Sequence, residues 1–292
     1  MKPSVSLAAA AEFLADRFSE PTVAVERLPE GLESQAFRFD LGAEEFVLRI
    51  GLSGRGFEKD RWAAAVAGRH VPVPVVFEIG SVAEALTYCI TQRLPGTTLE
   101  ELAPADAADV VGAVAGAWAA LASCDVRSVV GFGDFDAEGS APANTWRAVL
   151  LGTLEAATAA DDVSVLETYA RLVERCPEER ALVHGDFGSN NLLVNDGVVS
   201  GVLDWESAMV GDPLHDVANT RFWATHLPCM QVQAERFDQI LRDLPDYRER
   251  VLCYALRIGL EEAREARRDG DAELAEWASR RCRELIAVTT GG

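Results

Sequence analysis

Residues 182–191 of the chain read LVHGDFGSNN, and residues 202–206 read VLDWE. Two apolar, β-branched-rich runs lie between these stretches, and Asp196-Gly197 separates the two runs. Asp-Gly between such runs is a strong signal for a two-residue hairpin turn. With that turn, Asn191 faces roughly Val202 across the ladder. Asp204 then lies within a couple of positions of Asn191, so the hairpin carries two polar side chains at one end.

The spacing of the polar residues around this hairpin predicts a chemistry. Asp186 stands five residues before Asn191, and Asp204 stands thirteen residues after Asn191. Phosphoryl transfer from a nucleotide needs one carboxylate to orient the attacking hydroxyl, and an amide and a second carboxylate to hold Mg²⁺ on the phosphates. The order His-x-Asp-x-x-x-x-Asn, followed by Asp, is the pattern of a kinase catalytic loop and metal segment. The alternative is a surface hairpin with a polar entry loop.

The order of the other elements predicts an α+β protein in two lobes. Alternating apolar residues at 36–41, 45–50, 76–79 and 86–92 predict an antiparallel sheet, with helices at 5–18 and 59–69. After the breaker pair Pro95-Gly96 the chain is mainly helical, at 107–123, 144–176, 216–222, 231–241, 247–268 and 272–288. We therefore expect an N-terminal lobe over residues 1–95 and a C-terminal lobe over residues 96–292.

The composition excludes several classes of protein. The net charge is −20, of which −3 falls in residues 1–95 and −17 in the remainder, so nucleic acid is not an expected partner. The acidity serves either solubility or the attraction of a cationic substrate. No apolar run approaches a membrane span, and the charged first segment is not a signal peptide. The six cysteines are at least 24 residues apart, which predicts reduced thiols in a cytoplasmic protein rather than a zinc site.

These residues and motifs resemble the aminoglycoside phosphotransferase family, which has a two-lobed, protein-kinase-like fold. The His-Gly-Asp and Asp-Trp-Glu segments carry the resemblance, and it extends from Glu30 to Leu260 through Lys59-Asp60-Arg61, Thr145-Trp146 and Phe222-Trp223. The resemblance implies that Asp186 receives or orients the acceptor hydroxyl and that Asn191 and Asp204 bind Mg²⁺. His184, the other candidate catalytic residue, would pack and hydrogen-bond the loop, or alternatively move protons. Asp216 would brace the catalytic loop, or alternatively cap a helix.

The resemblance also implies a nucleotide site in the N-terminal lobe, for ATP or GTP. Gly31 and Ser34 lie where the family has a loop that covers the phosphates. Arg49 and Asp60 stand where kinases have a lysine and a glutamate; the alternative is a surface Arg–Asp pair. Gln92, Arg93 and Leu94 would offer backbone groups to the purine.

The expected acceptor is a cationic aminoglycoside, with hygromycin B foremost, bound by the acidic helical part of a monomer. Carboxylates would bind its ammonium groups and tryptophans would stack on its rings. The candidates are Asn190, Trp205, Glu206, Asp212, Trp223 and Glu261. Trp62, Trp118 and Trp146 are expected in the core, and residues 131–135 (GFGDF) in a turn, because a dinucleotide fingerprint would need a third glycine.

Two other functions remain open at this point. One is a kinase of another small alcohol, such as a macrolide, an amino alcohol or a sugar. The other is a nucleotide-binding module without catalysis. A protein kinase is disfavoured, because no long activation segment separates Asp204 from the next predicted helix.

Overall fold

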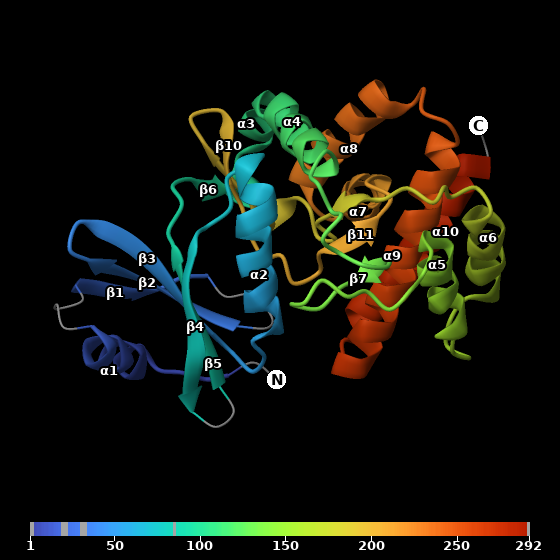
Figure 1. Ribbon diagram of the computed structural model, residues 1–292. Coiled ribbons are helices and arrows are strands. Elements are labelled where there is room, and N and C mark those ends of the chain that lie inside the picture. The colour runs from blue at the N-terminus through green and yellow to red at the C-terminus, as the bar shows by residue number, and fades with distance from the viewer. Residues whose placement is uncertain (1–2, 19–22, 30–33, 84–85, 291–292) are drawn as a thin grey trace.

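The computed structural model describes residues 3–18, 23–29, 34–83 and 86–290, and it has the two-lobed α+β architecture that the element order predicts (Figure 1). The N-terminal part holds an antiparallel sheet of five strands in the order β1-β2-β3-β5-β4. These strands are β1 (Val23–Arg27), β2 (Ser34–Leu41), β3 (Glu44–Gly51), β4 (Val76–Ala83) and β5 (Leu86–Gln92).

One face of this sheet carries its own small core under helix α1 (Leu7–Arg17). Ala10 and Leu14 of α1 pack on alternate residues of β2 and β3, such as Phe37, Phe39 and Leu48. Strict alternation in these strands aims every second side chain at the helix. This first hydrophobic cluster is separate from the larger one in the rest of the molecule.

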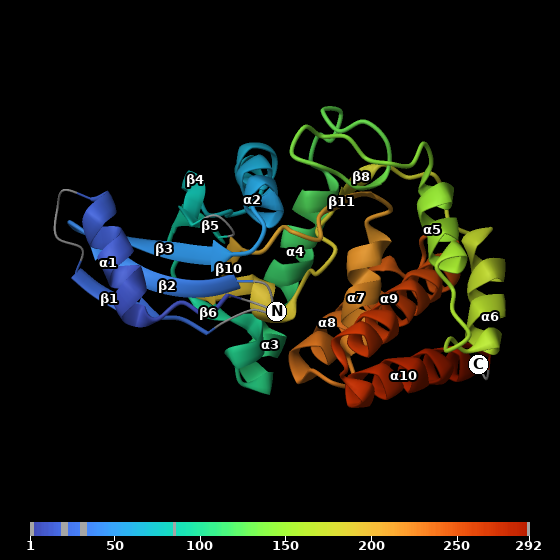
Figure 2. The ribbon, with the colours of Figure 1, turned by 90° about the horizontal axis from the view of Figure 1, so that it is seen from below.

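Helix α2 (Arg55–Val66) packs with the larger hydrophobic cluster, although the chain places α2 between two strands of the N-terminal sheet. Ala63, Ala67 and Val71 belong to that cluster. The helix therefore stands at the junction of the sheet and the helical part (Figures 1 and 2).

The C-terminal part is built from helices around two short three-stranded sheets. Its helices are α3 (Pro104–Asp109), α4 (Val111–Ala122), α5 (Trp146–Glu155), α6 (Val163–Val173), α7 (Leu214–Trp223), α8 (Pro228–Leu241), α9 (Tyr247–Asp269) and α10 (Ala272–Thr290). The sheets have the orders β10-β9-β6 and β7-β11-β8. Their strands are β6 (Thr97–Thr98), β7 (Gly133–Asp134), β8 (Ala181–Val183), β9 (Leu192–Asn195), β10 (Val198–Val202) and β11 (Met209–Gly211).

Two of the predicted helices were wrong in extent. The helix predicted over 144–176 is two helices, because residues 156–162 form a turn in which Asp161 accepts the amide of Thr158. Asp162 then caps α6 by accepting the amide of Ser164 at 2.9 Å. The helix predicted over 107–123 is broken at Val110, whose ψ of 0° is not helical.

The tryptophans and the glycine-rich segment differ in part from the prediction. Trp118 and Trp146 are buried, while Trp62 is only partly buried at the edge of the larger cluster. Gly131 and Gly133 have positive φ as a turn requires, but Gly133–Asp134 also forms β7 and pairs with β11. In the part of the chain that the structure describes, no helix is both long and apolar enough to cross a membrane.

Candidate active site

The chain after β8 forms a loop over residues 184–191, and buried side chains hydrogen-bond to this loop. His184 is fully buried, its Nε2 atom donates to the carbonyl oxygen of Leu203 at 2.9 Å, and its Nδ1 atom accepts the amide of Asp186 at 3.3 Å. Burial lowers the pKa of His184, so the imidazole is neutral, as these two hydrogen bonds require. His184 therefore ties the loop to the end of the hairpin.

Asp216, in the first turn of α7, holds the same loop by hydrogen bonds to its backbone. Its Oδ2 atom accepts the amide of His184 at 2.9 Å and its Oδ1 atom accepts the amide of Gly185 at 2.8 Å. The side chain is buried, and this burial raises the pKa of Asp216 to about 7. Gly185 has a φ of +86° and a Cβ there would lie 2.2 Å from the carbonyl oxygen of Ser207, so only glycine fits this turn.

The carboxylate of Asp186 is exposed, and two amides fix its orientation. Asn191 Nδ2 donates to Asp186 Oδ2 at 2.7 Å, and Asn219 Nδ2 donates to Asp186 Oδ1 at 3.3 Å. Asn219 lies one turn after Asp216 on α7 and also donates to the carbonyl oxygen of Phe187. Sequence reasoning missed Asn219, although its i+3 spacing from Asp216 places the two on one helix face.

The predicted hairpin is present, with a register one residue different from the expected one. Asp196 and Gly197 form the turn with positive φ, but a bulge at Ser200 pairs Val202 with Leu192 rather than with Asn191. The amide of Leu203 consequently donates to the carbonyl oxygen of Asn191 at 2.8 Å. The bulge thus brings Asp204 one position closer to Asn191.

Asn191 and Asp204 offer the hard oxygen ligands that Mg²⁺ prefers, and this ion retains several waters beside its protein ligands. Asn191 Nδ2 donates to both the carbonyl and the carboxylate of Asp186, which turns its Oδ1 atom away from Asp186. The Asp204 carboxylate is half exposed, and its residue has a φ of +58°. Left-handed backbone at a residue other than glycine persists only where neighbouring contacts impose it.

The N-terminal lobe reaches this site through Arg49 and Asp60. Arg49 Nη1 lies 2.7 Å from Asp60 Oδ2, and Arg49 Nη2 lies 3.8 Å from Asp204 Oδ1. Asp60 Oδ1 accepts the amide of Trp205 at 3.0 Å. Asp60 is thus buried and Arg49 is only partly exposed, so this is not the surface pair that was the alternative.

The backbone amides of the other predicted nucleotide-binding residues are in part used within the protein. The amides of Gln92 and Arg93 donate to the carbonyl oxygens of Val75 and Glu45, so neither amide is available to a purine. Leu94 follows them and is partly buried. Ser34 begins β2 opposite Gly51, while Gly31 lies outside the described residues.

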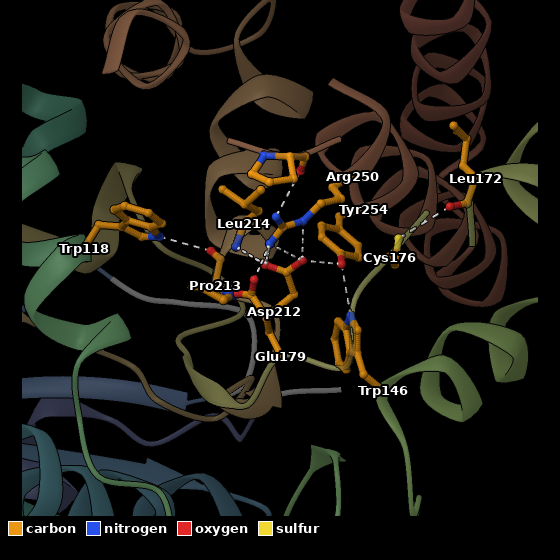
Figure 3. Close-up of polar contacts among 11 residues, drawn as sticks. Trp118, Trp146, Leu172, Cys176, Glu179, Asp212, Pro213, Leu214, Arg250 and Tyr254 are labelled. Atoms are coloured by element: carbon orange, nitrogen blue, oxygen red, sulfur yellow. Dashed lines mark hydrogen bonds and ion pairs between the residues drawn. The ribbon is translucent and has the colours of Figure 1, made fainter. Parts of the chain in front are cut away.

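Two of the residues predicted to bind the acceptor are core residues, which corrects that expectation. Trp205 is fully buried, packs on His184 with ring centroids 4.7 Å apart, and donates to the carbonyl oxygen of Val202. Asp212 is also fully buried. It accepts from Arg250 at 2.9 Å and from Tyr254 at 2.6 Å (Figure 3). The hydrogen-bonding capacity of the Asp212 carboxylate is used inside the protein, so neither side chain can meet a ligand.

The remaining acceptor candidates lie in different places. Asn190 is exposed next to Asn191. Trp223 ends α7, on the helix face that carries Asn219, and stacks on Trp277 with ring centroids 5.0 Å apart. Glu206 lies against Gly56 of α2.

The carboxylate of Glu261, in α9, is bound by residues of α5 and α9. It accepts from Thr153 at 3.0 Å and pairs with Arg257 at 3.1 Å. Burial first, and then the negative charges of Glu265, Asp186 and Asp271, raise the pKa of its neighbour Glu262, which sequence reasoning missed. Of these two glutamates, Glu262 is therefore the one whose pKa responds to the charge of Asp186.

Comparison with known proteins gives consistent matches. The model of the phosphotransferase enzyme family matches residues 24–253. The chain is 36% identical to hygromycin-B 4-O-kinase of Escherichia coli, over 99% of this chain and 88% of that protein. It is 31% identical to viomycin phosphotransferase of Streptomyces vinaceus, over 45% of this chain and 48% of that protein.

Solved structures agree with these sequence matches. A thermostable mutant of aminoglycoside phosphotransferase APH(4)-Ia, in ternary complex with ADP and hygromycin B, superposes with a TM-score of 0.89 at 36% identity. The match covers 96% of this chain and 98% of that chain. A second complex of that protein, with AMP-PNP and hygromycin B, gives a TM-score of 0.87 at 36% identity over 97% of this chain and all of that one.

Proposed function

The chain belongs to the phosphotransferase enzyme family, and from that premise we propose that it transfers the γ-phosphoryl group of ATP to a hydroxyl group of hygromycin B. The observation that carries the proposal is the carboxylate of Asp186, which is exposed and held by the side-chain amides of Asn191 and Asn219. The adenine nucleotides and the antibiotic in the similar structures support this choice of donor and acceptor. The name of the Escherichia coli relative supports the 4-hydroxyl as the position modified.

Asp186 would act by placing the acceptor hydroxyl in line with the γ-phosphorus. The hydroxyl donates a hydrogen bond to the carboxylate, the new O–P bond forms as the bond from the γ-phosphorus to ADP breaks, and the hydroxyl proton passes to Asp186. Such transition states are loose, so the placement of the hydroxyl matters more than the strength of the base. The two amide donors keep the carboxylate from rotating away, and this fits a positioning role.

Asn191 Oδ1 and the Asp204 carboxylate would hold Mg²⁺. When bound, the ion would neutralise charge on the phosphates and bridge them to the protein. Arg49 supports this end of the site, since it lies 3.8 Å from Asp204 and pairs with Asp60. Its guanidinium would contact the phosphates in the place where kinases have a lysine.

The surroundings of Asp186 favour a cationic acceptor. Burial, and after it the negative charges of Glu265 and Asp186, raise the pKa of Glu262, and an ammonium group of the acceptor would be attracted to this concentration of carboxylates. Trp223, partly exposed and on the same face of α7 as Asn219, offers an aromatic surface for a sugar ring or a cation. A neutral macrolide would gain nothing from these carboxylates.

The test is a reaction with ATP and a panel of acceptors, followed by mass measurement of the products. Addition of one phosphate to hygromycin B, and none to a macrolide or a simple sugar, is the expected result. Asp186→Ala should lower kcat roughly 10³-fold, while the binding of AMP-PNP stays within about two-fold of wild type. Phosphorylation of another acceptor in preference to hygromycin B would contradict the proposed substrate, and full activity of Asp186→Ala would contradict the proposed site.

A further inference from the structure

Lys59 of α2 is a buried cation with no place in the chemistry described so far. Its side chain is 1% exposed, at the junction where α2 packs on the larger hydrophobic cluster. Its Nζ atom donates to the carbonyl oxygen of Glu206 at 2.7 Å, to the carbonyl oxygen of Ala208 at 2.8 Å and to the carboxylate of Asp134. An ammonium group has three hydrogens, so these acceptors satisfy it completely.

Packing alone does not account for a lysine at this position. Phe135 lies under the ammonium, 5.0 Å from Nζ, but an apolar side chain of the same length would leave the carbonyl oxygens of Glu206 and Ala208 without this donor. Burial lowers the pKa of Lys59, which reflects the cost of keeping its charge there. An ion pair with the half-exposed carboxylate of Asp134 contributes little to stability, whereas the two bonds from Lys59 to main-chain carbonyl oxygens fix a backbone segment.

The contacts of Lys59 fall on the segment that follows Asp204. Asp60, next in sequence, accepts the amide of Trp205, so two consecutive residues of α2 hold the backbone at 205, 206 and 208. Gly56, one turn earlier, leaves room for the Glu206 side chain, because a Cβ on Gly56 would lie 3.1 Å from Glu206 Oε2. Helix α2 thus contacts the backbone of residues 205–208 and the side chain of Glu206.

In the chain, Asp204 lies between the hairpin and residues 205–208, which α2 contacts. On its other side, the amide and the carbonyl of Leu203 bond to Asn191 and to His184. Asp204 itself has a left-handed φ of +58°, a conformation that needs support from both directions. Loss of the contacts on the α2 side would let the residue relax and move its carboxylate.

We propose that Lys59 is a positioning residue for binding of the Mg²⁺-nucleotide, which acts by fixing the backbone of residues 206–208 and through it the carboxylate of Asp204. This rests on the proposed function, since it assumes that Asp204 faces the metal end of a nucleotide. The GFGDF segment gains a role as well, because its Asp134 is the acceptor that anchors the ammonium from β7. The N-terminal lobe is thereby tied to the metal segment by a contact independent of Arg49.

The experiment compares Lys59→Met with Arg55→Met. Arg55 is a matched control, because it is also a cation of α2 bound to Asp134, but its side chain is 51% exposed and its described bond goes to Asp134 rather than to the 206–208 carbonyls. We expect Lys59→Met to weaken binding of Mg²⁺·AMP-PNP by about 10- to 100-fold in calorimetry, as loss of supporting residues around metal ligands does. Binding of ADP without Mg²⁺, and of hygromycin B, should stay within about two-fold, and Arg55→Met should behave as wild type.

A second measurement needs no nucleotide. Amide hydrogen exchange over residues 204–208 should become faster in Lys59→Met than in Arg55→Met, because the backbone has lost its anchor. If circular dichroism shows that Lys59→Met does not fold, Lys59→Gln takes its place; its amide can still donate to a carbonyl, so it should give a smaller loss of the same kind.

The outcomes separate this inference from the proposed function. Equal loss of Mg²⁺·AMP-PNP, metal-free ADP and hygromycin B binding would overturn the inference in favour of a general structural role. Unchanged Mg²⁺·AMP-PNP binding and unchanged exchange at 204–208 would also overturn it. If wild type binds Mg²⁺·AMP-PNP but phosphorylates no aminoglycoside, the proposed function fails, while the binding and exchange data still decide the role of Lys59.

Discussion

Asp212 gives the sharpest distinction between a substrate ligand and a structural residue. Its carboxylate is completely buried and accepts from Arg250 Nε and Nη2, each at 2.9 Å, from Tyr254 at 2.6 Å and from the amide of Leu214 at 3.0 Å (Figure 3). Asp212→Ala would leave the Arg250 guanidinium buried without its main partner. Removal of one partner from a buried ion pair costs about 3–5 kcal/mol.

The cost can be measured as a change in thermal stability. At about 2 °C per kcal/mol for a chain of this size, Asp212→Ala should lower the Tm by about 6–10 °C. The double variant Asp212→Ala/Arg250→Met should recover part of that loss, because it removes the unpaired charge as well. Any loss of activity should appear in kcat, since the Leu214 amide links Asp212 to the start of α7, and KM for hygromycin B should stay within about two-fold.

The result that would refute this reasoning is specific. A Tm close to that of wild type, together with a KM for hygromycin B that rises ten-fold or more, would mean that Asp212 meets the acceptor. In that case the buried arrangement with Arg250 and Tyr254 would not be the one that operates in solution.

Three further predictions concern the catalytic loop and the acceptor site. Asn219→Ala should lower kcat about ten-fold, with nucleotide binding unchanged in calorimetry, because the Asp186 carboxylate loses one of its two amide donors. Burial raises the pKa of Asp216 to about 7, so the folded protein binds that proton more tightly than the unfolded chain does. The contribution of Asp216 to stability is therefore full below about pH 4 and is lost as the pH rises through 7; in Asp216→Asn, denaturant titrations across this range should show that this part of the pH dependence has disappeared. Glu262→Gln should raise KM for hygromycin B in steady-state kinetics and Glu261→Gln should not; the reverse order would place the acceptor on the other face of α9.

Local sequence signals were sufficient for much of the fold. The Asp196-Gly197 turn and four strands of the N-terminal sheet follow from dihedral preference and alternation, which neighbouring residues decide among themselves. The fifth strand, β1, was not predicted. The break between α5 and α6 was missed because alanine and leucine run through the segment. Only the capping by Asp162 and the contacts of Asp161 with the distant Arg264 and Arg267 end the helices there.

Local sequence signals did not predict which side chains around the candidate site are buried. Acidic and aromatic residues next to the Asp-Trp-Glu segment were read together as acceptor ligands, yet Trp205 packs behind His184 and Asp212 is enclosed by α9. Their partners are far away in the chain, so no spacing rule could separate them from an exposed residue such as Asn190.

By itself, the sequence singled out the groups that we propose carry the chemistry. Asp186, Asn191 and Asp204 stand on one short loop and one hairpin, and short chain distances limit how far apart they can be. The tertiary structure alone decided what holds them. Asn219 comes from α7, Asp216 braces the loop from the same helix, and Lys59 reaches the metal segment from α2, across 147 residues of chain. Contacts of that separation depend on how the whole chain packs, and the entropy of closing such long loops is overcome only when the cores on both sides form.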